Sequence, residues 1–296
     1  MRESSFADAC DCHVHVVGPT DQFPQVVPGS YSAGLAMLES LRAAAEPVGV
    51  SRFVIVQPSF YGNDNSCLLE ALEKLGGSGR GVAVVDAAST SFSMLASYGR
   101  HGVCGLRLNV YSSVVADADR ILERSLKQTL GILPPGWHIE IIARAGTLAA
   151  AAPFLVTADV PVVINHYGLP ESESTKDRAG RALLDLAASP NVWIKLSAPY
   201  RCSTDPLSTS PPAEWLTALL HAAPDRCVWG SDWPHTPPRS DAASEIKTLP
   251  YRNIAYGRLF NDFLAALVTP ETARRILIEN PNRLYGFANP QHGASG

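Results

Sequence analysis

The stretch Asp11-Cys12-His13-Val14-His15, near the amino end, is matched near the carboxyl end by Trp229-Gly230-Ser231-Asp232-Trp233-Pro234-His235. Each stretch is typical of a β-strand that ends in ionisable side chains. Because side chains alternate between the two faces of a strand, His13 and His15 share one face. If these are the first and last strands of one closed barrel, the two imidazoles meet the Asp232 carboxylate at the barrel mouth. The two stretches therefore predict a site that activates water for hydrolysis.

Short apolar segments alternate with longer helical patterns along the chain. We expect eight strands at Asp11–Val17, Arg52–Gln57, Gly81–Asp86, Val103–Asn109, Trp137–Ala143, Val160–His166, Val192–Ser197 and Cys227–Gly230. We expect helices between them at Leu35–Glu46, Leu68–Leu75, Asp117–Leu130, Thr147–Leu155, Arg178–Ala188 and Ala213–Ala222. Eight strand–helix units favour an α/β fold of the (β/α)8 TIM-barrel type. An open doubly wound sheet is the weaker alternative, because no glycine-rich phosphate loop follows any strand.

Length and composition fit one catalytic barrel. The chain has 296 residues, and α/β barrels typically take about 250. We expect one domain over 1–288 and a disordered tail over 289–296. A hydrophobic content of 46% and a charged content of 18% are typical of a soluble enzyme.

The net charge and the cysteines indicate which kinds of partner and which cellular compartment to expect. The net charge of −4 argues against nucleic-acid binding, and no apolar run is long enough to cross a membrane. Six scattered cysteines and a start without a secretory pattern favour a reduced, cytoplasmic protein. The sequence leaves the formation of a homo-oligomer open.

Four of the eight histidines fall at predicted strand ends, where barrel enzymes place their reactive groups. We expect His13, His15 and His166 to be catalytic or ligand residues, whereas His235 could equally stabilise a loop. Asp232 is the expected general base, because a carboxylate among imidazoles can stay ionised and accept a proton from water. The structural alternative for Asp232 is a helix cap.

Two arginines are the expected anion-binding residues. The guanidinium groups of Arg107 and Arg201 can bind carboxylates through two parallel hydrogen bonds, and structural ion pairs are the alternative. Ser59 and Tyr31 could add hydrogen bonds to substrate oxygens, although contacts within loops are as plausible for both. The expected partner is thus a small anionic molecule.

Further motifs follow in a fixed order: Gln57-Pro58-Ser59, Asn63-Asp64-Asn65, Gly105–Asn109, His166-Tyr167-Gly168, Lys195-Leu196-Ser197 and Asn280–Phe287. Together with the two stretches quoted above, they resemble the amidohydrolase superfamily, amidohydrolase family 2, in the branch of the 2-pyrone-4,6-dicarboxylate lactonases. The resemblance covers about residues 11–287 and implies a TIM-barrel hydrolase of cyclic esters that requires no metal. It implies that Asp232 activates water and that the three histidines polarise the lactone carbonyl. It also implies that substrate carboxylates are held by Arg107, Arg201, Ser59 and Tyr31.

Two positions depart from that pattern. Ser113 and Leu169 stand near places where the pyrone-dicarboxylate enzymes have arginines. Each missing charge-assisted hydrogen bond is worth about 1.5–3 kcal/mol. We therefore expect a less anionic lactone, such as a monocarboxylate, muconolactone-like or sugar-acid lactone from aromatic or sugar-acid catabolism.

The same residues leave a metal-dependent alternative. One zinc ion held by His13, His15 and Asp232 is an alternative to the metal-free mechanism, since nitrogen and oxygen ligands suit zinc. Lys195 and Glu140 lie in the middle of predicted strands, and we place them in a polar layer inside the barrel without a catalytic step. Alternative activities are a zinc-dependent decarboxylase and a lactone isomerase. A binding protein without catalysis is disfavoured, because a binder needs no general base.

Overall fold

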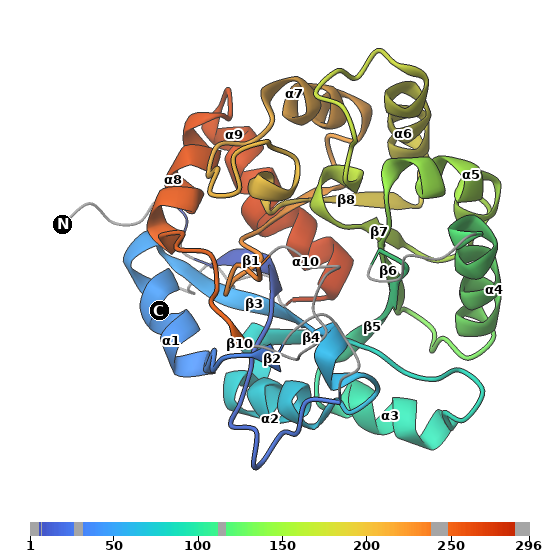
Figure 1. Ribbon diagram of the computed structural model, residues 1–296, viewed down its shortest axis with the longest axis vertical. Helices are drawn as coiled ribbons and strands as arrows, with labels where there is room; N and C mark the ends of the chain where they lie inside the picture. Colours follow the sequence, from blue (N-terminus) through green and yellow to red (C-terminus); the bar gives the residue numbers. More distant parts are fainter. Residues whose placement is uncertain (1–5, 7, 27–31, 112–116, 238–247, 288–296) are drawn as a thin grey trace, which may run out of the picture.

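Eight parallel strands form a nearly closed barrel that is surrounded by helices, as the computed structural model shows (Figure 1). The structure describes residues 6, 8–26, 32–111, 117–237 and 248–287. The strands are β1 (Ala9–Val14), β3 (Val50–Val56), β4 (Gly79–Ala83), β5 (Val103–Asn109), β6 (His138–Ile142), β7 (Val162–Ile164), β8 (Val192–Ser197) and β9 (Cys227–Gly230). Each pairs in parallel with the next in this order. The predicted (β/α)8 TIM barrel is confirmed.

Helices follow the strands around the outside of the barrel (Figure 1). The α-helices are α1 (Leu38–Ala45), α2 (Ser66–Leu75), α3 (Phe92–Arg100), α4 (Ala118–Leu130), α5 (Ala145–Leu155), α6 (Arg178–Ala188), α7 (Ala213–Ala222), α8 (Tyr256–Ala265), α9 (Pro270–Arg274) and α10 (Asn280–Tyr285). Short helical turns are η1 (Glu46–Val48), η2 (Ser59–Tyr61), η3 (Gly76–Ser78), η4 (His166–Gly168), η5 (Pro199–Arg201) and η6 (Arg275–Glu279). A small parallel pair joins β2 (Ser32–Ala33) to β10 (Thr248–Leu249).

Two sequence expectations concern the carboxyl-terminal tail and the crossing of a membrane. The tail predicted over 289–296 lies outside the described residues. Among the described helices, none combines the length and the apolar character that a membrane crossing needs.

Strands β1 and β9 meet, so the two ends of the chain close the barrel. The backbone N–H of Asp232 donates to the His13 carbonyl at 2.9 Å, and the His15 N–H donates to the Trp233 carbonyl at 2.8 Å. Gly230 permits this approach, because a Cβ there would lie 2.7 Å from His13 Cβ and 2.9 Å from its backbone nitrogen. The contact on which the predicted site depends is therefore present.

Asp11, the first residue of the quoted stretch, ties this seam together. One carboxylate oxygen accepts from the Ser231 N–H at 2.9 Å and from the His13 N–H at 3.1 Å. The other accepts from the Tyr256 hydroxyl of α8 at 2.9 Å. Burial raises the pKa of Asp11 to about 6, although these hydrogen bonds lower it. Asp11 thus joins β1, β9 and α8 by contacts that occupy both of its oxygens.

The chain turns sharply where strands β7, β8 and β9 end. Non-glycine residues adopt positive φ there: His166 at 53°, Ala198 at 51°, Asp232 at 61° and His235 at 67°. Such φ values are uncommon for residues with a Cβ and tend to occur at functional sites. Because of this turn, β7 ends at Ile164 rather than at His166 as expected from the sequence.

Candidate active site

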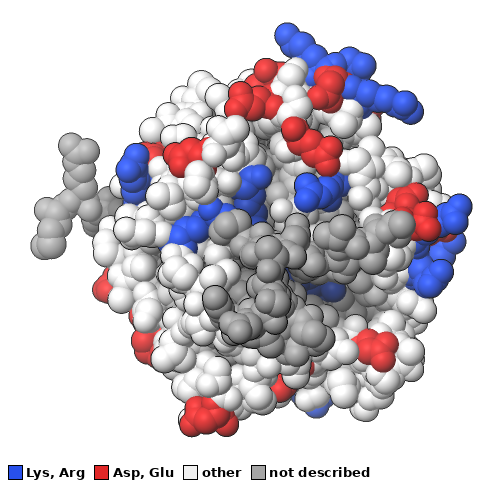
Figure 2. Space-filling model, viewed as in Figure 1, with Lys and Arg blue, Asp and Glu red and all other residues white. Residues whose placement is uncertain are grey.

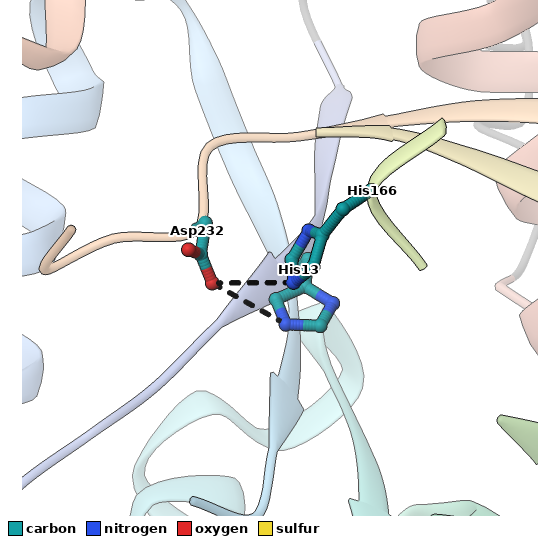
Figure 3. Close-up of side chains that lie close together, drawn as sticks. All are labelled: His13, His166 and Asp232. Carbon is teal, nitrogen blue, oxygen red and sulfur yellow. Dashed lines mark ion pairs between the residues drawn. The ribbon is translucent and has the colours of Figure 1, made fainter. Parts of the chain in front are cut away.

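Three imidazoles and one carboxylate converge at the barrel mouth. Figure 3 shows two of the imidazoles, His13 and His166, beside Asp232. Nε2 of His13 and Nε2 of His15 each lie 3.5 Å from Oδ1 of Asp232, and Nε2 of His166 lies 4.0 Å from it. All four residues are buried. The structure thus brings together the four catalytic candidates: His13 in β1, His15 just after it, His166 in η4 and Asp232 in the loop after β9.

The two oxygens of Asp232 have different surroundings. Oδ2 accepts from the Tyr200 hydroxyl at 2.7 Å and from Nε of Arg201 at 3.0 Å. Oδ1 has no hydrogen-bond partner among the described residues. Although burial raises its pKa, the Arg201 guanidinium holds the pKa of Asp232 well below its usual range. The site therefore contains an ionised carboxylate with one oxygen open to a ligand or a water molecule.

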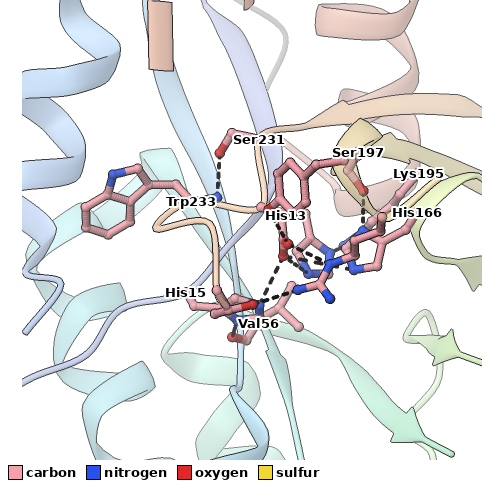
Figure 4. A network of polar contacts seen from close by, with 12 residues as sticks. His13, His15, Val56, His166, Lys195, Ser197, Ser231 and Trp233 are labelled. Atoms are coloured by element: carbon pink, nitrogen blue, oxygen red, sulfur yellow. Dashed lines mark hydrogen bonds and ion pairs between the residues drawn. The ribbon is translucent and has the colours of Figure 1, made fainter. Parts of the chain in front are cut away.

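The imidazoles are fixed from behind by different partners (Figure 4). His15 Nδ1 lies 2.7 Å from the Val56 carbonyl, which can only accept, so Nδ1 carries the proton and a neutral ring leaves a lone pair on Nε2. His166 Nδ1 lies 2.8 Å from the Ser197 hydroxyl. Burial lowers the pKa of His13 to about 3 and that of His166 well below its usual value. Both of these rings are therefore neutral at neutral pH.

A buried ion pair lies beneath His13 inside the barrel. Nζ of Lys195, from β8, lies 2.5 Å from Oε2 of Glu140, from β6. The same Nζ lies 3.3 Å from Nδ1 of His13. Although burial raises it, the pKa of Glu140 is held well below its usual range, chiefly by Lys195. The expected polar layer inside the barrel is present, and it reaches the candidate site directly.

A pocket opens at three of the four residues, His15, His166 and Asp232. Its lining is His15, Pro58, Ser59, Phe60, Arg107, Asn109, Tyr111, Ile142, His166, Arg201, Asp232, Thr236 and Pro237. Arg107 Nη1 donates to the Gln57 carbonyl at 2.6 Å. Arg201 contacts Asp232 and also donates to the Thr236 hydroxyl at 2.6 Å, so it combines the structural ion pair with a place at the pocket wall. Tyr31 lies outside the described residues.

His235, the fourth histidine expected at a strand end, packs against Tyr200. His235 is buried and lies edge-on to the Tyr200 ring, with 6.0 Å between ring centroids. Burial lowers its pKa to about 4. Of its two expected roles, this placement fits packing behind the site better than contact with a substrate.

Sequence reasoning missed Tyr200 and two arginines near the mouth. The Arg144 guanidinium lies 5.1 Å from the centroid of the Tyr111 ring, and that of Arg252 lies 4.7 Å from the Tyr200 ring. Arg252 also donates to the Thr236 carbonyl at 3.1 Å. Arg144 follows the predicted fifth strand directly, so its position at a strand end was a usable signal.

The charged side chains are unevenly spread over this face. Figure 2 shows Lys and Arg both near its centre and at its edge, while acidic side chains lie mainly toward its edge. Of the two positions that depart from the lactonase pattern, Leu169 is buried and Ser113 lies outside the described residues. The mouth is therefore suited to an anionic ligand even though those two positions carry no charge.

The four residues also fit a divalent metal ion. His13, His166 and Asp232 each offer one ligand atom, and these atoms lie within 4.8 Å of one another. His15, which we expected in this set from the sequence, offers its Nε2 at 3.5 Å from the same Asp232 oxygen. Nitrogen and oxygen donors of this kind suit zinc. The metal-free mechanism stays a prediction.

The family profile described as Amidohydrolase matches residues 10–287, so the chain belongs to the amidohydrolase family. A 2-pyrone-4,6-dicarboxylate hydrolase from Comamonas testosteroni is 30% identical over 296 residues, covering 94% of this chain and 90% of the relative. A 4-sulfomuconolactone hydrolase from Hydrogenophaga intermedia is 29% identical over 279 residues, covering 93% and 88%.

Solved structures agree with the fold. A probable 2-pyrone-4,6-dicarboxylic acid hydrolase from Acinetobacter baumannii, solved with citric acid bound, superposes with a TM-score of 0.77 at 25% identity. The match covers 95% of this chain and 100% of that chain. Two more distant structures share the fold alone. An amidohydrolase from Burkholderia multivorans was solved with zinc bound (TM-score 0.66), and a dihydroxybenzoic acid decarboxylase from Polaromonas sp. JS666 with manganese bound (TM-score 0.61).

Proposed function

We propose that this protein hydrolyses the ester bond of a small anionic lactone. The observation that carries the proposal is the open Oδ1 of Asp232, which faces three imidazoles at the base of an arginine-lined pocket. The named hydrolases among its relatives act on lactones by their names, and this supports the same reaction class here.

The first step joins water to the lactone. Asp232 Oδ1 takes a proton from a water molecule, and the water oxygen forms a bond to the carbonyl carbon. The carbonyl oxygen becomes an oxyanion, which an imidazole N–H and nearby positive charge stabilise. Donors aimed at a developing charge in a water-poor site supply a large part of catalysis in such reactions.

The second step opens the ring. The oxyanion re-forms the carbonyl, the bond between that carbon and the ring oxygen breaks, and the leaving oxygen takes the proton back from the Asp232 carboxyl. One water molecule is consumed, the product is a hydroxy acid, and Asp232 returns to its ionised form.

Arginines and a hydroxyl position the substrate in this proposal. Arg107 and Ser59 line the pocket and bind the substrate carboxylate. Tyr31 keeps the role of a substrate ligand that we assigned from the sequence. Arg201 orients Asp232 and offers the remainder of its guanidinium to the substrate. With Ser113 and Leu169 in place of arginines, we propose a substrate with one carboxylate.

A divalent ion is the alternative source of activation. His13, His15, His166 and Asp232 would hold it, and a bound ion would polarise the carbonyl as a Lewis acid or lower the pKa of water. The proposal is that turnover needs no such ion.

A lactone panel tests the proposal. Purified protein is treated with chelator, divided, and assayed with and without zinc against pyrone, muconolactone and sugar-acid lactones. We expect acid release from a monocarboxylate lactone in both portions. Activity only with zinc would contradict the metal-free reaction. Release of carbon dioxide, or an isomerised lactone without acid, would replace hydrolysis by one of the alternative activities.

We also propose that residues 1–288 act as one catalytic domain in the cytoplasm. The family match over residues 10–287 supports the domain. The six cysteines are free thiols, which fits a reducing compartment.

A further inference from the structure

We propose that Lys195 is a positioning residue that keeps the proton of His13 on Nε2, so that His13 serves the site as a hydrogen-bond donor rather than as a metal ligand. The inference rests on the proposed function only where the His13 Nε2–H is said to stabilise the oxyanion. The proton position itself is independent of any substrate. It follows from three groups beneath the site: Nζ of Lys195, Nδ1 of His13 and the Glu140 carboxylate. Figure 4 shows Lys195 beside His13.

The direction of the hydrogen bonds around Lys195 is set by its chemistry. An ammonium group has three donors and no acceptor. Nζ donates to Glu140 Oε2 at 2.5 Å and to His13 Nδ1 at 3.3 Å. His13 Nδ1 must therefore accept with its lone pair, and the single proton of the neutral ring sits on Nε2. That atom faces Asp232 Oδ1 at 3.5 Å.

Glu140 could accept a hydrogen bond from His13 Nδ1, which is the reverse of the hydrogen bond with Lys195. Its Oε1 lies 3.3 Å from His13 Nδ1 and has no hydrogen-bond partner within the described part of the chain. Without the Lys195 ammonium, this oxygen would accept from an Nδ1–H, and Nε2 would then carry the lone pair. The competition between Lys195 and Glu140 for one nitrogen thus selects which side of His13 is protonated.

His15 provides an internal contrast. Its Nδ1–H donates to the Val56 carbonyl at 2.7 Å, which leaves Nε2 as the lone-pair atom. Histidines that bind metals usually donate their other ring N–H to a carbonyl or carboxylate in this way. His13 has an ammonium donor where such a histidine would have an acceptor. Lys195 therefore disfavours a metal ion at His13 and presents Nε2–H to the oxyanion.

Nitrogen NMR of the wild-type protein reads the proton position directly. Protein labelled with nitrogen-15 is purified free of metal, and the His13 signals are identified by their loss in His13→Gln. We expect a protonated Nε2 and an unprotonated Nδ1 at His13, and the reverse pattern at His15. A protonated Nδ1 at His13 would overturn the inference, even in a protein that hydrolyses lactones.

Two variants test the selecting role of Lys195. Lys195→Met leaves Glu140 as the only partner of His13 Nδ1, and we expect the proton to move to Nδ1. Because an unpaired buried carboxylate can prevent folding, Lys195→Met/Glu140→Leu replaces the whole pair by apolar side chains and should lose the fixed pattern. Lys127→Met, which removes an exposed lysine paired with Glu123, is the matched control and should leave His13 unchanged.

Zinc binding and kinetics give a second readout. Second-shell changes typically alter metal affinity by about 10–100-fold, so we expect Lys195→Met to bind zinc at least about tenfold more tightly than wild type. Its metal-free kcat should fall while KM changes little. Unchanged zinc affinity and an unchanged nitrogen pattern in a folded Lys195 variant would refute the selecting role. Absence of lactone turnover with the expected wild-type pattern would refute only the proposed function.

Discussion

Asp11 and Asp232 are two fully buried aspartates at the same seam of the barrel, yet their surroundings differ. Both oxygens of Asp11 accept hydrogen bonds, from two backbone N–H groups and from the Tyr256 hydroxyl. Asp232 has the partners Tyr200 and Arg201 on one oxygen only. Contacts within the fold therefore use both oxygens of Asp11, whereas Oδ1 of Asp232 has no hydrogen-bond partner among the described residues.

The pKa values of the two aspartates follow the same division. Burial raises the pKa of Asp11 to about 6. Its hydrogen-bond partners are neutral and lower the pKa only in part. The Arg201 guanidinium holds the pKa of Asp232 well below its usual range in spite of burial. The comparison shows that burial alone does not identify a reactive carboxylate in this protein. We propose that the identifying feature is an open oxygen beside a cation and imidazoles.

The same substitution at the two aspartates should give opposite results. Asp232→Asn removes the base, and we expect kcat to fall by about 10²–10⁴-fold while the substrate still binds. Asp11→Asn places an amide N–H₂ against donors, and we expect a loss of about 2 kcal/mol of stability with turnover per folded molecule largely retained. Steady-state kinetics and urea unfolding measure both. Comparable kinetic losses in the two variants would remove the distinction.

The cation beside Asp232 can be tested through the pH dependence of kcat/KM. In the proposed reaction the active form of Asp232 is the carboxylate, and Arg201 lowers its pKa. Arg201→Met should raise that pKa, so the acid limb should move to higher pH by about one to two units, given about 1.5–3 kcal/mol for a charged hydrogen bond. Arg107→Met also removes a pocket cation, but the Arg107 guanidinium contacts the Gln57 carbonyl, whereas Arg201 contacts Asp232. Arg107→Met should raise KM without moving the limb, and equal movement in both variants would contradict the assignment.

A smaller effect concerns a buried histidine away from the mouth. Burial lowers the pKa of His138 to about 4, against about 6.5 for an exposed histidine. Between these values the unfolded chain binds a proton that the folded protein does not, so stability is lost as pH falls through this window. His138→Asn should reduce the slope of unfolding free energy against pH by up to about 1.4 kcal/mol per pH unit. Urea unfolding between pH 4.5 and 7.5 measures it, and an unchanged slope would show that His138 does not titrate this way.

Much of the fold could be predicted because buried parallel strands leave a strong apolar signal. The predicted bounds of β5, β8, β9, α6 and α7 agree with the structure. Strand β7 is shorter than expected, because the positive φ of His166 turns the chain away from the sheet. Helix α3 was missed, and its start depends on a Ser91 side chain that accepts from the Met94 N–H, which is a weak local signal.

The site was predictable where a strand end presents its residues, and less so where partners come from across the barrel. His13, His15, His166 and Asp232 could be singled out from their positions. The sequence placed Lys195 and Glu140 in one polar layer, but it did not predict their direct ion pair beside His13. Strands β6 and β8 are separated by β7, and their side chains meet only inside the closed barrel. Tyr200 gave no signal either, since its contact with Asp232 depends on the turn after β8.

Oxygen labelling tests the central claim most directly. Wild type and Asp232→Asn are each given the lactone that the panel identifies, in water enriched in oxygen-18, and the hydroxy-acid product is analysed by mass spectrometry. Our account predicts one labelled oxygen in the new carboxylate with wild type and almost no product with Asp232→Asn. Unlabelled product, or equal labelled product from both proteins, would contradict it.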